Sequence, residues 1–189
     1  LINKDMVSDF VREHGITLVE HDQVGARWIA NLIALKQAVS HVHANKIITF
    51  HSRVSYAQEF ASETSRGIAG LLPSYEVCHV NGKQRSGDRR DIIAAFGRAP
   101  LSLLTNARCL TEGVDIPAVD MVAFIDPRQS RVDIAQAVGR AMRKPRSGPE
   151  KRLGYVVVPL FAGADDDDDI GKAIHSEKFD GVADVLAAL

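Results

Sequence analysis

Short apolar runs alternate along the chain with longer segments in which apolar residues recur at helical spacing. Each short run is continuously apolar rather than alternating, as expected when helices cover both faces of a mostly parallel sheet. The order of strand and helix predicts an α/β fold with a doubly wound sheet of five or six strands. The predicted strands are 46–50 (KIITF), 75–80 (YEVCHV), 100–105 (PLSLLT), 120–125 (DMVAFI) and 154–161 (GYVVVPLF).

Four segments between and before these runs carry the period of a helix packed on one face. Apolar residues three and four positions apart share that face. Three of the four segments begin at a serine, which is a favoured N-cap. The predicted helices are 23–43, 52–72 with Ser52 as cap, 86–97 with Ser86 as cap, and 130–145 with Ser130 as cap. Their predicted core positions include Ile29, Leu32, Ile33, Leu35, Ala57, Phe60, Ala61, Ile68, Leu71, Ile92, Ile93, Phe96, Ile134 and Val138.

Composition narrows the class of protein. The 189 residues carry a formal net charge of -1 and two cysteines. A nearly neutral chain is typical of a globular protein, so contact with nucleic acid has to come from local basic clusters. The low cysteine content argues against a disulfide framework or a four-cysteine zinc site and favours a cytoplasmic location. No apolar run is long enough to span a bilayer and no leader opens the chain, so no membrane partner is expected.

The chain is expected to divide into three parts. It begins at Leu1 rather than methionine, which suggests a piece of something longer. Residues 1–22 are predicted to lead in from a preceding domain, residues 23–162 to form the α/β domain, and residues 163–189 to form an acidic loop and a last helix. Five aspartates in a row repel one another and seldom converge on one ion, so no metal site is expected at 165–169.

The loops after three strands carry the residues best suited to bind a ligand. In open α/β sheets a ligand binds outside the carboxyl ends of the strands. The loops after 46–50, 100–105 and 120–125 should therefore meet at one edge. The last of them leads into QAVGRAMR, in which helical spacing places one set of residues on a face opposite the core positions. That set is Gln136, Gly139, Arg140 and Arg143.

The two arginines of this set suit an anion. A guanidinium presents a fixed fork of donors that matches phosphate oxygens, and Arg140 and Arg143 lie one turn apart. Gly139 leaves room for a ligand or a facing backbone to approach. Taken alone, the pair also fits a solvated helix face that forms ion pairs with neighbouring carboxylates.

Four segments in order resemble the second RecA-like domain of superfamily 2 helicases and translocases. QAVGRAMR resembles that family's motif VI, TNARCLTEGVDIP (105–117) its motif V and ITFHSR (48–53) its motif IV. VNGKQRSGDRRDIIAAF (80–96) resembles the segment between motifs IV and V. The resemblance covers about residues 45–160, and four ordered motifs are far more specific than any one. Gln136 stands where DEAD-box RNA helicases have histidine, which resembles the DEAH-like, restriction-enzyme-like or repair-like branches.

The resemblance implies roles on a nucleotide side and on a nucleic-acid side. Arg143 would be an arginine finger that reaches a γ-phosphate across an interdomain cleft, with Arg140 beside it. Gln136 would orient the attacking water or couple the cleft to motif V. The backbone and ribose contacts would come from Gly113, Asp115 and Gly139. Nucleic-acid phosphates would be held, without sequence readout, by Ser52, Arg53, Asn81, Thr105 and Thr111. For Ser52, Asn81 and Thr111, ordinary turn or cap formation is the alternative.

Other candidates carry less information. Two basic clusters, 83–90 and 143–152, fit either a strand path or a solvated face. The spacing of Trp28, Tyr56 and Tyr75 favours packing over base stacking. The histidines His41, His43, His51 and His79 match no ligand spacing and are interpreted as structural.

The chain lacks a P-loop and the acidic pair that holds magnesium. NGKQR (81–85) has glutamine where Ser or Thr would follow the lysine, and no glycine stands five positions before Gly82. In the family those parts belong to the first RecA-like domain. The resemblance thus implies ATP and Mg²⁺ bound mainly by an upstream domain of the same chain, and no ATP hydrolysis by these residues alone.

Two interpretations of different classes remain. One is the C-terminal motor domain of an ATP-dependent nucleic-acid helicase or translocase, with DNA favoured over RNA by family analogy. The other is a non-catalytic RecA-like module for nucleic-acid binding or assembly. A dinucleotide-binding dehydrogenase is disfavoured, because no G-x-G-x-x-G follows a predicted strand.

Overall fold

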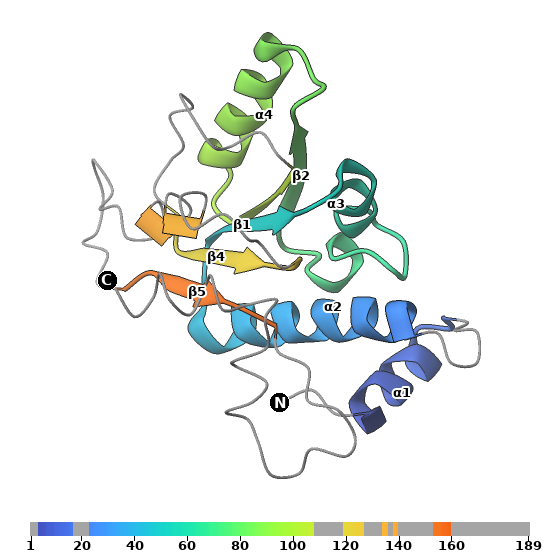
Figure 1. Ribbon diagram of the computed structural model, residues 1–189. Coiled ribbons are helices and arrows are strands. Elements are labelled where there is room, and N and C mark those ends of the chain that lie inside the picture. Colours follow the sequence, from blue (N-terminus) through green and yellow to red (C-terminus); the bar gives the residue numbers. More distant parts are fainter. Residues whose placement is uncertain are drawn as a thin grey trace.

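A computed structural model of the chain describes residues 4–16, 23–107, 119–126, 134–135, 138–139 and 153–159. Five parallel strands in this part of the chain form one sheet in the order β2-β3-β1-β4-β5 (Figure 1). All five predicted strands are present, which confirms the parallel α/β fold. Their bounds are β1 (Lys46–His51), β2 (Glu76–Asn81), β3 (Ser102–Ala107), β4 (Met121–Phe124) and β5 (Tyr155–Val157).

Helices cover both faces of the sheet, as predicted. In Figure 1 α2 lies below the strands and α4 above them. The described helices are α1 (Lys4–Glu13), α2 (Gln23–Val42), α3 (Val54–Phe60), the 3₁₀ turn η1 (Ala69–Leu71) and α4 (Ser86–Arg98). The prediction for 23–43 is confirmed by α2. Helix α4 begins at Ser86 with Arg85 as the N-cap residue, so the predicted cap is one position too late.

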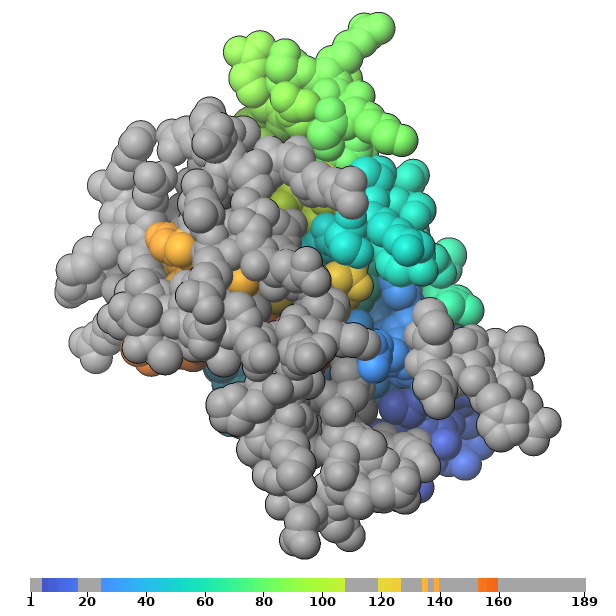
Figure 2. Space-filling view, in the orientation of Figure 1, coloured from blue at the N-terminus to red at the C-terminus, as the bar shows by residue number. Residues whose placement is uncertain are grey.

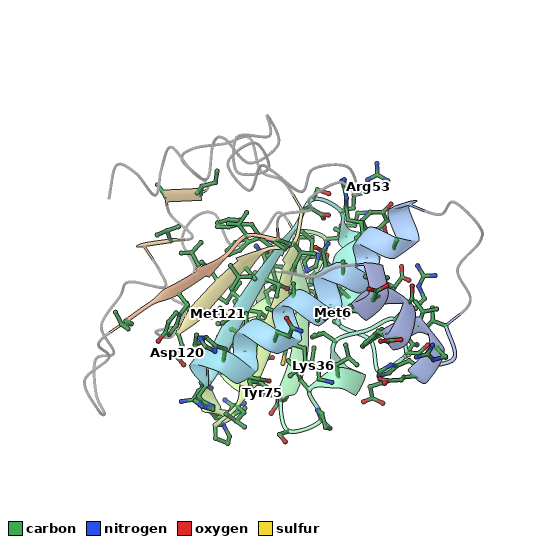
Figure 3. The ribbon with its side chains drawn as sticks, turned by 90° about the horizontal axis from the view of Figure 1, so that it is seen from below. Met6, Lys36, Arg53, Tyr75, Asp120 and Met121 are labelled. Carbon is green, nitrogen blue, oxygen red and sulfur yellow. The ribbon has the colours of Figure 1, made fainter. Side chains whose placement is uncertain are left out.

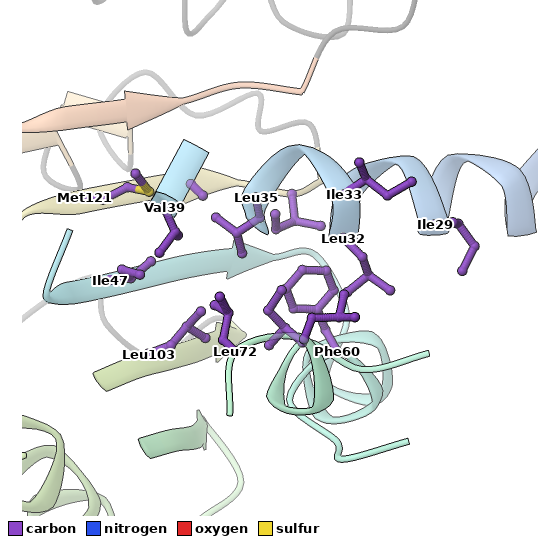
Figure 4. Close-up of a cluster of buried hydrophobic side chains, with 14 of the residues drawn as sticks. Ile29, Leu32, Ile33, Leu35, Val39, Ile47, Phe60, Leu72, Leu103 and Met121 are labelled. Atoms are coloured by element: carbon purple, nitrogen blue, oxygen red, sulfur yellow. The ribbon is translucent and has the colours of Figure 1, made fainter. Parts of the chain in front are cut away.

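The two faces carry separate apolar clusters because neighbouring strand residues point to opposite sides. On the α2 side, Ile47 and Leu103 pack against Leu32, Leu35 and other residues of that face (Figure 4). On the α4 side, the cluster consists of Ile48, Phe50, Val80, Ile93, Phe96, Leu104, Val119, Val122, Phe124, Ile134 and Val138. This two-sided burial explains why the strands are continuously apolar in sequence.

Helix α1 was not predicted. Residues 1–22 were expected only to lead in from another domain, whereas Lys4–Glu13 forms a helix that packs on α2. Phe10 and Ile16 are buried in the same cluster as the inward face of α2. The division of the chain at residues 22 and 162 stays a prediction.

The predicted helix over 52–72 is wrong in length and in its cap. Helix α3 ends at Phe60, and η1 follows only at Ala69. Between them the chain turns back, so that the Ile68 amide donates to the Phe60 carbonyl at 2.8 Å. A Cβ at Gly67 would lie 2.0 Å from the Ser62 carbonyl oxygen, so this turn requires glycine. Apolar residues on both sides of the turn stay buried, which is why the sequence pattern resembled one helix.

A set of polar residues fastens the amino ends of the strands, here called the amino edge and defined by Lys46, Tyr75 and Asp120. The Lys46 ammonium donates to the carbonyls of Phe96 at 2.6 Å, Gly97 at 3.1 Å and Ala99, and to Ser102 Oγ at 3.1 Å. A cation there stabilises the C-terminus of α4. Burial lowers the pKa of Lys46, and the carboxylates of Asp120 and Glu76 oppose that shift.

Asp120 and Tyr75 complete the amino edge. Asp120 Oδ2 accepts from the backbone amides of Asn45 and Lys46, each at 2.9 Å. The Tyr75 hydroxyl donates to the Ala44 carbonyl at 2.6 Å. Tyr75 therefore packs, as its spacing predicted, and its hydroxyl also binds the chain just before β1. Figure 3 shows Asp120 and Tyr75 at the opposite end of the sheet from Arg53.

Candidate functional site

The carboxyl ends of the strands meet at one edge, as predicted. Register aligns His51 of β1 with Ala107 of β3, and Ala107 with Asn81 of β2. Ser52 and Arg53 follow β1 directly, and Asp126 lies two residues beyond β4. We call this set, Ser52, Arg53, Asn81 and Asp126, the carboxyl edge. Three of its four members are candidates from the sequence.

Ser52 does not cap α3. Arg53 is the N-cap residue, and no side chain makes a capping hydrogen bond. Instead the Ser52 amide and hydroxyl both donate to Asp126 Oδ2, at 2.8 and 3.1 Å. One carboxylate oxygen thus joins the loop after β1 to the end of β4. This bond gives Ser52 a turn-holding role, the alternative that its residue type already suggested.

Arg53 points away from the sheet and rests on an aromatic ring. Its guanidinium lies 5.2 Å from the centroid of the Tyr56 ring. Tyr56 in turn meets the Trp28 ring edge to face at 5.9 Å, and Trp28 Nε1 donates to the Arg66 carbonyl at 2.8 Å. Arg53 is exposed. Trp28 thus packs, as predicted, while Tyr56 supports an exposed cation.

Arg53 forms no ion pair with the part of the chain that the structure describes. The pairs found there join Arg12 to Asp9 at 2.6 Å and Arg66 to Glu59 at 3.4 Å. A guanidinium without a carboxylate partner keeps its in-plane donors available to a ligand. The charge of Arg53 is therefore directed outward.

Asn81 shapes the turn between β2 and α4. Its side-chain Oδ1 accepts from the Lys83 backbone amide, and its backbone amide donates to Gln84 Oε1, each at 2.9 Å. Asn81 Nδ2 also donates to His79 Nε2 at 3.1 Å, and the residue is only 8% exposed. Both the oxygen and the nitrogen of the Asn81 side chain thus form hydrogen bonds within the protein. The turn directs Lys83 outward, where it is exposed.

Thr105 lies inside the sheet. It is fully buried, and its hydroxyl accepts from His79 Nδ1 at 2.8 Å and donates to the Cys78 carbonyl at 3.4 Å. Burial lowers the pKa of His79, so the neutral imidazole is favoured. His79 therefore joins Thr105 to Asn81. The Thr105 hydroxyl is thus linked through His79 to Asn81 of the carboxyl edge. The predicted contact of Thr105 with a phosphate stays a prediction.

The first basic cluster lies at the start of α4, on the part of the molecule that projects at the top of Figure 2. Lys83, Arg85 and Arg90 are exposed, and Arg89 is half-buried. Arg89 donates to the Gln84 carbonyl at 2.9 Å, which closes the turn onto the helix. These four cations make no ion pair with the described residues. They extend the positive charge of Arg53 along the same edge.

The described parts of the motif VI segment agree with its predicted faces. Residues 134–135 and 138–139 are helical. Ile134 and Val138 are buried against β1 and β4, whereas Gly139 is exposed with no atom within 4 Å of a Cβ built there. Among the described residues, no packing therefore requires glycine at this position. The remaining predicted site residues, Gln136, Arg140, Arg143, Thr111, Gly113 and Asp115, lie outside the described residues.

Two positions at this edge were missed by the sequence reasoning. Asp126 was passed over as a loop residue, although a carboxylate directly after a strand at the ligand edge was a usable signal. Tyr56 was taken for packing, although its place three residues after Arg53 on a helix brings the two side chains together.

The described residues contain no cluster of three or more His, Cys, Asp or Glu side chains placed to hold a metal ion. Nor do they contain a helix with the length and apolar character needed to cross a membrane.

Comparison with known sequences points to one family. Residues 30–145 match the model described as the helicase conserved C-terminal domain. The ATP-dependent RNA helicase DBP4 of Yarrowia lipolytica is 34% identical over 103 residues, 54% of this chain and 13% of that protein. The DBP4 protein of Coccidioides immitis is 33% identical over 104 residues, 55% of this chain and 12% of that protein. The chain thus matches only 12–13% of the length of these relatives.

Solved structures share the fold. An ATP-dependent Type ISP restriction-modification enzyme, LlaBIII, bound to DNA superposes with a TM-score of 0.71 at 20% identity, covering 96% of this chain and 13% of that one. Domain 2 of the DEAD-box helicase Mss116p, bound to an RNA duplex, gives 0.56 at 19% identity, covering 71% and 50%. The E. coli DEAD-box protein SrmB gives 0.54 at 20% identity, covering 69% and 70%. At these identities the likeness shows a RecA-like fold.

Proposed function

The chain belongs to the helicase conserved C-terminal domain family, and from that premise we propose that it is the C-terminal motor domain of an ATP-dependent nucleic-acid helicase or translocase. The observation that carries the proposal is the overlap of this family match, residues 30–145, with the carboxyl edge. Within that range Arg53, Lys83, Arg85 and Arg90 direct positive charge outward without carboxylate partners among the described residues. Such an edge suits phosphate oxygens of a nucleic-acid backbone.

The nucleotide is proposed to lie at the face of the motif VI helix. By helical spacing Arg140 and Arg143 share that face with Gly139, which is exposed while Ile134 and Val138 are buried. Gly139 would let a ligand approach, Arg140 and Arg143 would bind phosphate oxygens, and Gln136 would orient water. Asp115 and Gly113 would meet the ribose side. Bound with Mg²⁺ mainly by an upstream RecA-like domain, ATP supplies phosphoryl-transfer chemistry to this cleft.

The nucleic acid is proposed as RNA or DNA, with the choice left to the test. The DBP4 relatives of Yarrowia lipolytica and Coccidioides immitis are named RNA helicases, and the expectation of DNA over RNA has no support from them. Contacts to phosphates do not by themselves read sequence or sugar.

The proposal is tested by ATP hydrolysis of the full-length native protein with and without single-stranded and duplex RNA and DNA. We expect nucleic acid to stimulate turnover, and Arg143→Ala to lower kcat by on the order of three decades or more. Arg98→Ala, an exposed arginine at the far end of α4, is the matched control and should hydrolyse normally. Normal turnover by Arg143→Ala, or no turnover by the native protein, would favour the non-catalytic binding module instead.

A second test concerns the present residues alone. Because the chain has no P-loop, we propose that the 189-residue chain does not hydrolyse ATP by itself. Turnover by the purified chain above the level of its own Arg143→Ala variant would contradict this.

A further inference from the structure

The carboxyl edge holds one exposed cation in a defined position. We infer that Tyr56 and Asp126 are positioning residues that set the guanidinium of Arg53, the residue of the loop after β1 to which the proposed function assigns a nucleic-acid phosphate. The inference rests on the proposed function, because it names how one part of that nucleic-acid path works. The sequence assigned neither role, since Tyr56 was interpreted as a packing residue and Asp126 was not considered.

Asp126 fixes the backbone that leads into Arg53. Its Oδ2 accepts from the amide of Ser52 at 2.8 Å and from the hydroxyl of the same residue at 3.1 Å. Asp126 follows β4, and β4 pairs with β1 in parallel. The loop is therefore fastened to a neighbouring strand immediately before Arg53. A side chain that starts from a fixed peptide loses less conformational entropy when it binds a ligand.

Tyr56 fixes the other end of the side chain. The Arg53 guanidinium lies over its ring at 5.2 Å, and the ring is held edge to face by Trp28 at 5.9 Å. Trp28 is itself anchored by its bond of 2.8 Å to the Arg66 carbonyl. The contact to the ring is electrostatic and uses none of the five N–H donors of the guanidinium in a hydrogen bond. Those donors remain directed to solvent and suit two oxygens of one phosphate.

Ser52 is a poorer phosphate ligand than Arg53 in this loop. Its hydroxyl hydrogen is donated to Asp126, so what it offers a phosphate is lone pairs. The hydrogen bonds between Ser52 and Asp126 use the hydroxyl hydrogen of Ser52 and also fix the backbone before Arg53. Arg53 carries a full positive charge and is exposed.

The experiment measures binding of fluorescently labelled single-stranded RNA and DNA to the full-length native protein over a range of salt concentrations. Arg53→Ala should weaken binding to all sequences and reduce the slope of log Kd against log salt by about one. Tyr56→Leu should raise Kd about two- to fivefold, because a cation–π contact at an exposed site contributes about that much. Asp126→Ala should raise Kd about two- to tenfold through loss of two hydrogen bonds.

Matched variants separate positioning from folding. Tyr56→Phe keeps the ring, and no hydrogen bond of the Tyr56 hydroxyl is found among the described residues, so this variant should bind normally. Arg53→Lys keeps the charge at an exposed position but loses the flat head, so its Kd should rise about as much as that of Tyr56→Leu. Arg98→Ala removes an exposed charge from the far end of α4 and should bind like the wild type.

Double variants test whether Tyr56 and Asp126 act through Arg53. If Tyr56 and Asp126 act through Arg53, then Tyr56→Leu and Asp126→Ala add no further loss in an Arg53→Ala background. Losses that add, or an Arg53→Ala variant that binds like Arg98→Ala, would overturn this inference while leaving the proposed function intact. Failure of the wild type to bind either nucleic acid would overturn the proposed function, and this inference with it.

Discussion

Asp120 and Asp126 lie on either side of β4 and accept hydrogen bonds from residues at the two ends of β1, but their surroundings differ. At the amino edge Asp120 Oδ2 accepts from two backbone amides, and at the carboxyl edge Asp126 Oδ2 accepts from an amide and a hydroxyl. The cation beside Asp120, Lys46, is bonded to three carbonyls and a serine of the chain. Arg53, which follows the serine that Asp126 binds, forms no ion pair with the described carboxylates and faces solvent.

Residue type and distance therefore do not separate structural from functional polar groups. What separates them is whether the donors are used within the fold. The amino edge uses its donors to fasten α4 and β1, so it should govern stability. The carboxyl edge leaves cationic donors directed outward, so it should govern binding and contribute little to stability.

The largest effect is expected for Lys46→Met, which keeps the aliphatic stem and removes the ammonium. Four acceptors lose a charged donor, and we expect the free energy of unfolding to fall by about 2–3 kcal/mol. Urea unfolding followed by circular dichroism measures the change. Lys36→Met, at an exposed position of α2, is the control and should stay within about 0.5 kcal/mol of the wild type. Equal losses in the two variants would contradict a special role for the amino edge.

A matched pair of aspartate variants sharpens the comparison. Asp120→Ala leaves the Asn45 and Lys46 amides without their acceptor and should cost about 1–2 kcal/mol of unfolding free energy, with normal affinity for nucleic acid. Asp126→Ala acts at an exposed serine, where water replaces the carboxylate, so it should cost less than about 1 kcal/mol but weaken binding. Unfolding midpoints and binding isotherms are measured on both proteins. A larger loss of stability in Asp126→Ala, or weaker binding in Asp120→Ala, would contradict the difference between the two edges.

The sequence predicted the parts of this fold that follow from periodicity. Continuous apolar runs identified all five strands, and helical spacing identified α2, α4 and the buried positions Ile134 and Val138. It could not predict where α3 ends, because the apolar positions on both sides of the turn at Ser62–Gly67 keep a helical spacing. A close approach of one backbone atom to Gly67 decides that turn, and such an approach depends on tertiary packing.

The candidate site was predictable to a similar extent. The position of a residue at the end of a strand follows from the strand itself, so Ser52, Arg53 and Asn81 were placed at the right edge. The direction of a hydroxyl or an amide does not follow, because it depends on partners from other strands. Ser52 forms hydrogen bonds to Asp126, and Asn81 forms hydrogen bonds with His79, Lys83 and Gln84. Both side chains thus make internal hydrogen bonds that the sequence did not predict, and their contacts to nucleic acid stay predictions.

A smaller effect is expected from pH. Because burial lowers the pKa of His79 below 6.5, the unfolded state binds a proton more readily than the native state. Stability should therefore fall as the pH drops below about 6.5 and show no contribution from this group above it. His79→Gln removes the titrating group, so its unfolding midpoint should decline less between pH 7 and pH 5 than that of the wild type. Parallel declines in the two proteins would show that His79 does not titrate in this way.

The smallest effect is expected for Ser52→Ala, and it divides two accounts of the carboxyl edge. If the Ser52 hydroxyl held a phosphate, as the family resemblance implies, its loss should weaken nucleic-acid binding about as much as a lost hydrogen bond to a charged group, about tenfold or more. If the hydroxyl only strengthens the bond to Asp126, the backbone amide keeps the loop in place, at 2.8 Å. Affinity should then change by less than about twofold and stability by less than about 0.5 kcal/mol. A large loss of affinity in this variant alone would return Ser52 to the nucleic-acid path and leave Arg53 as its neighbour rather than its replacement.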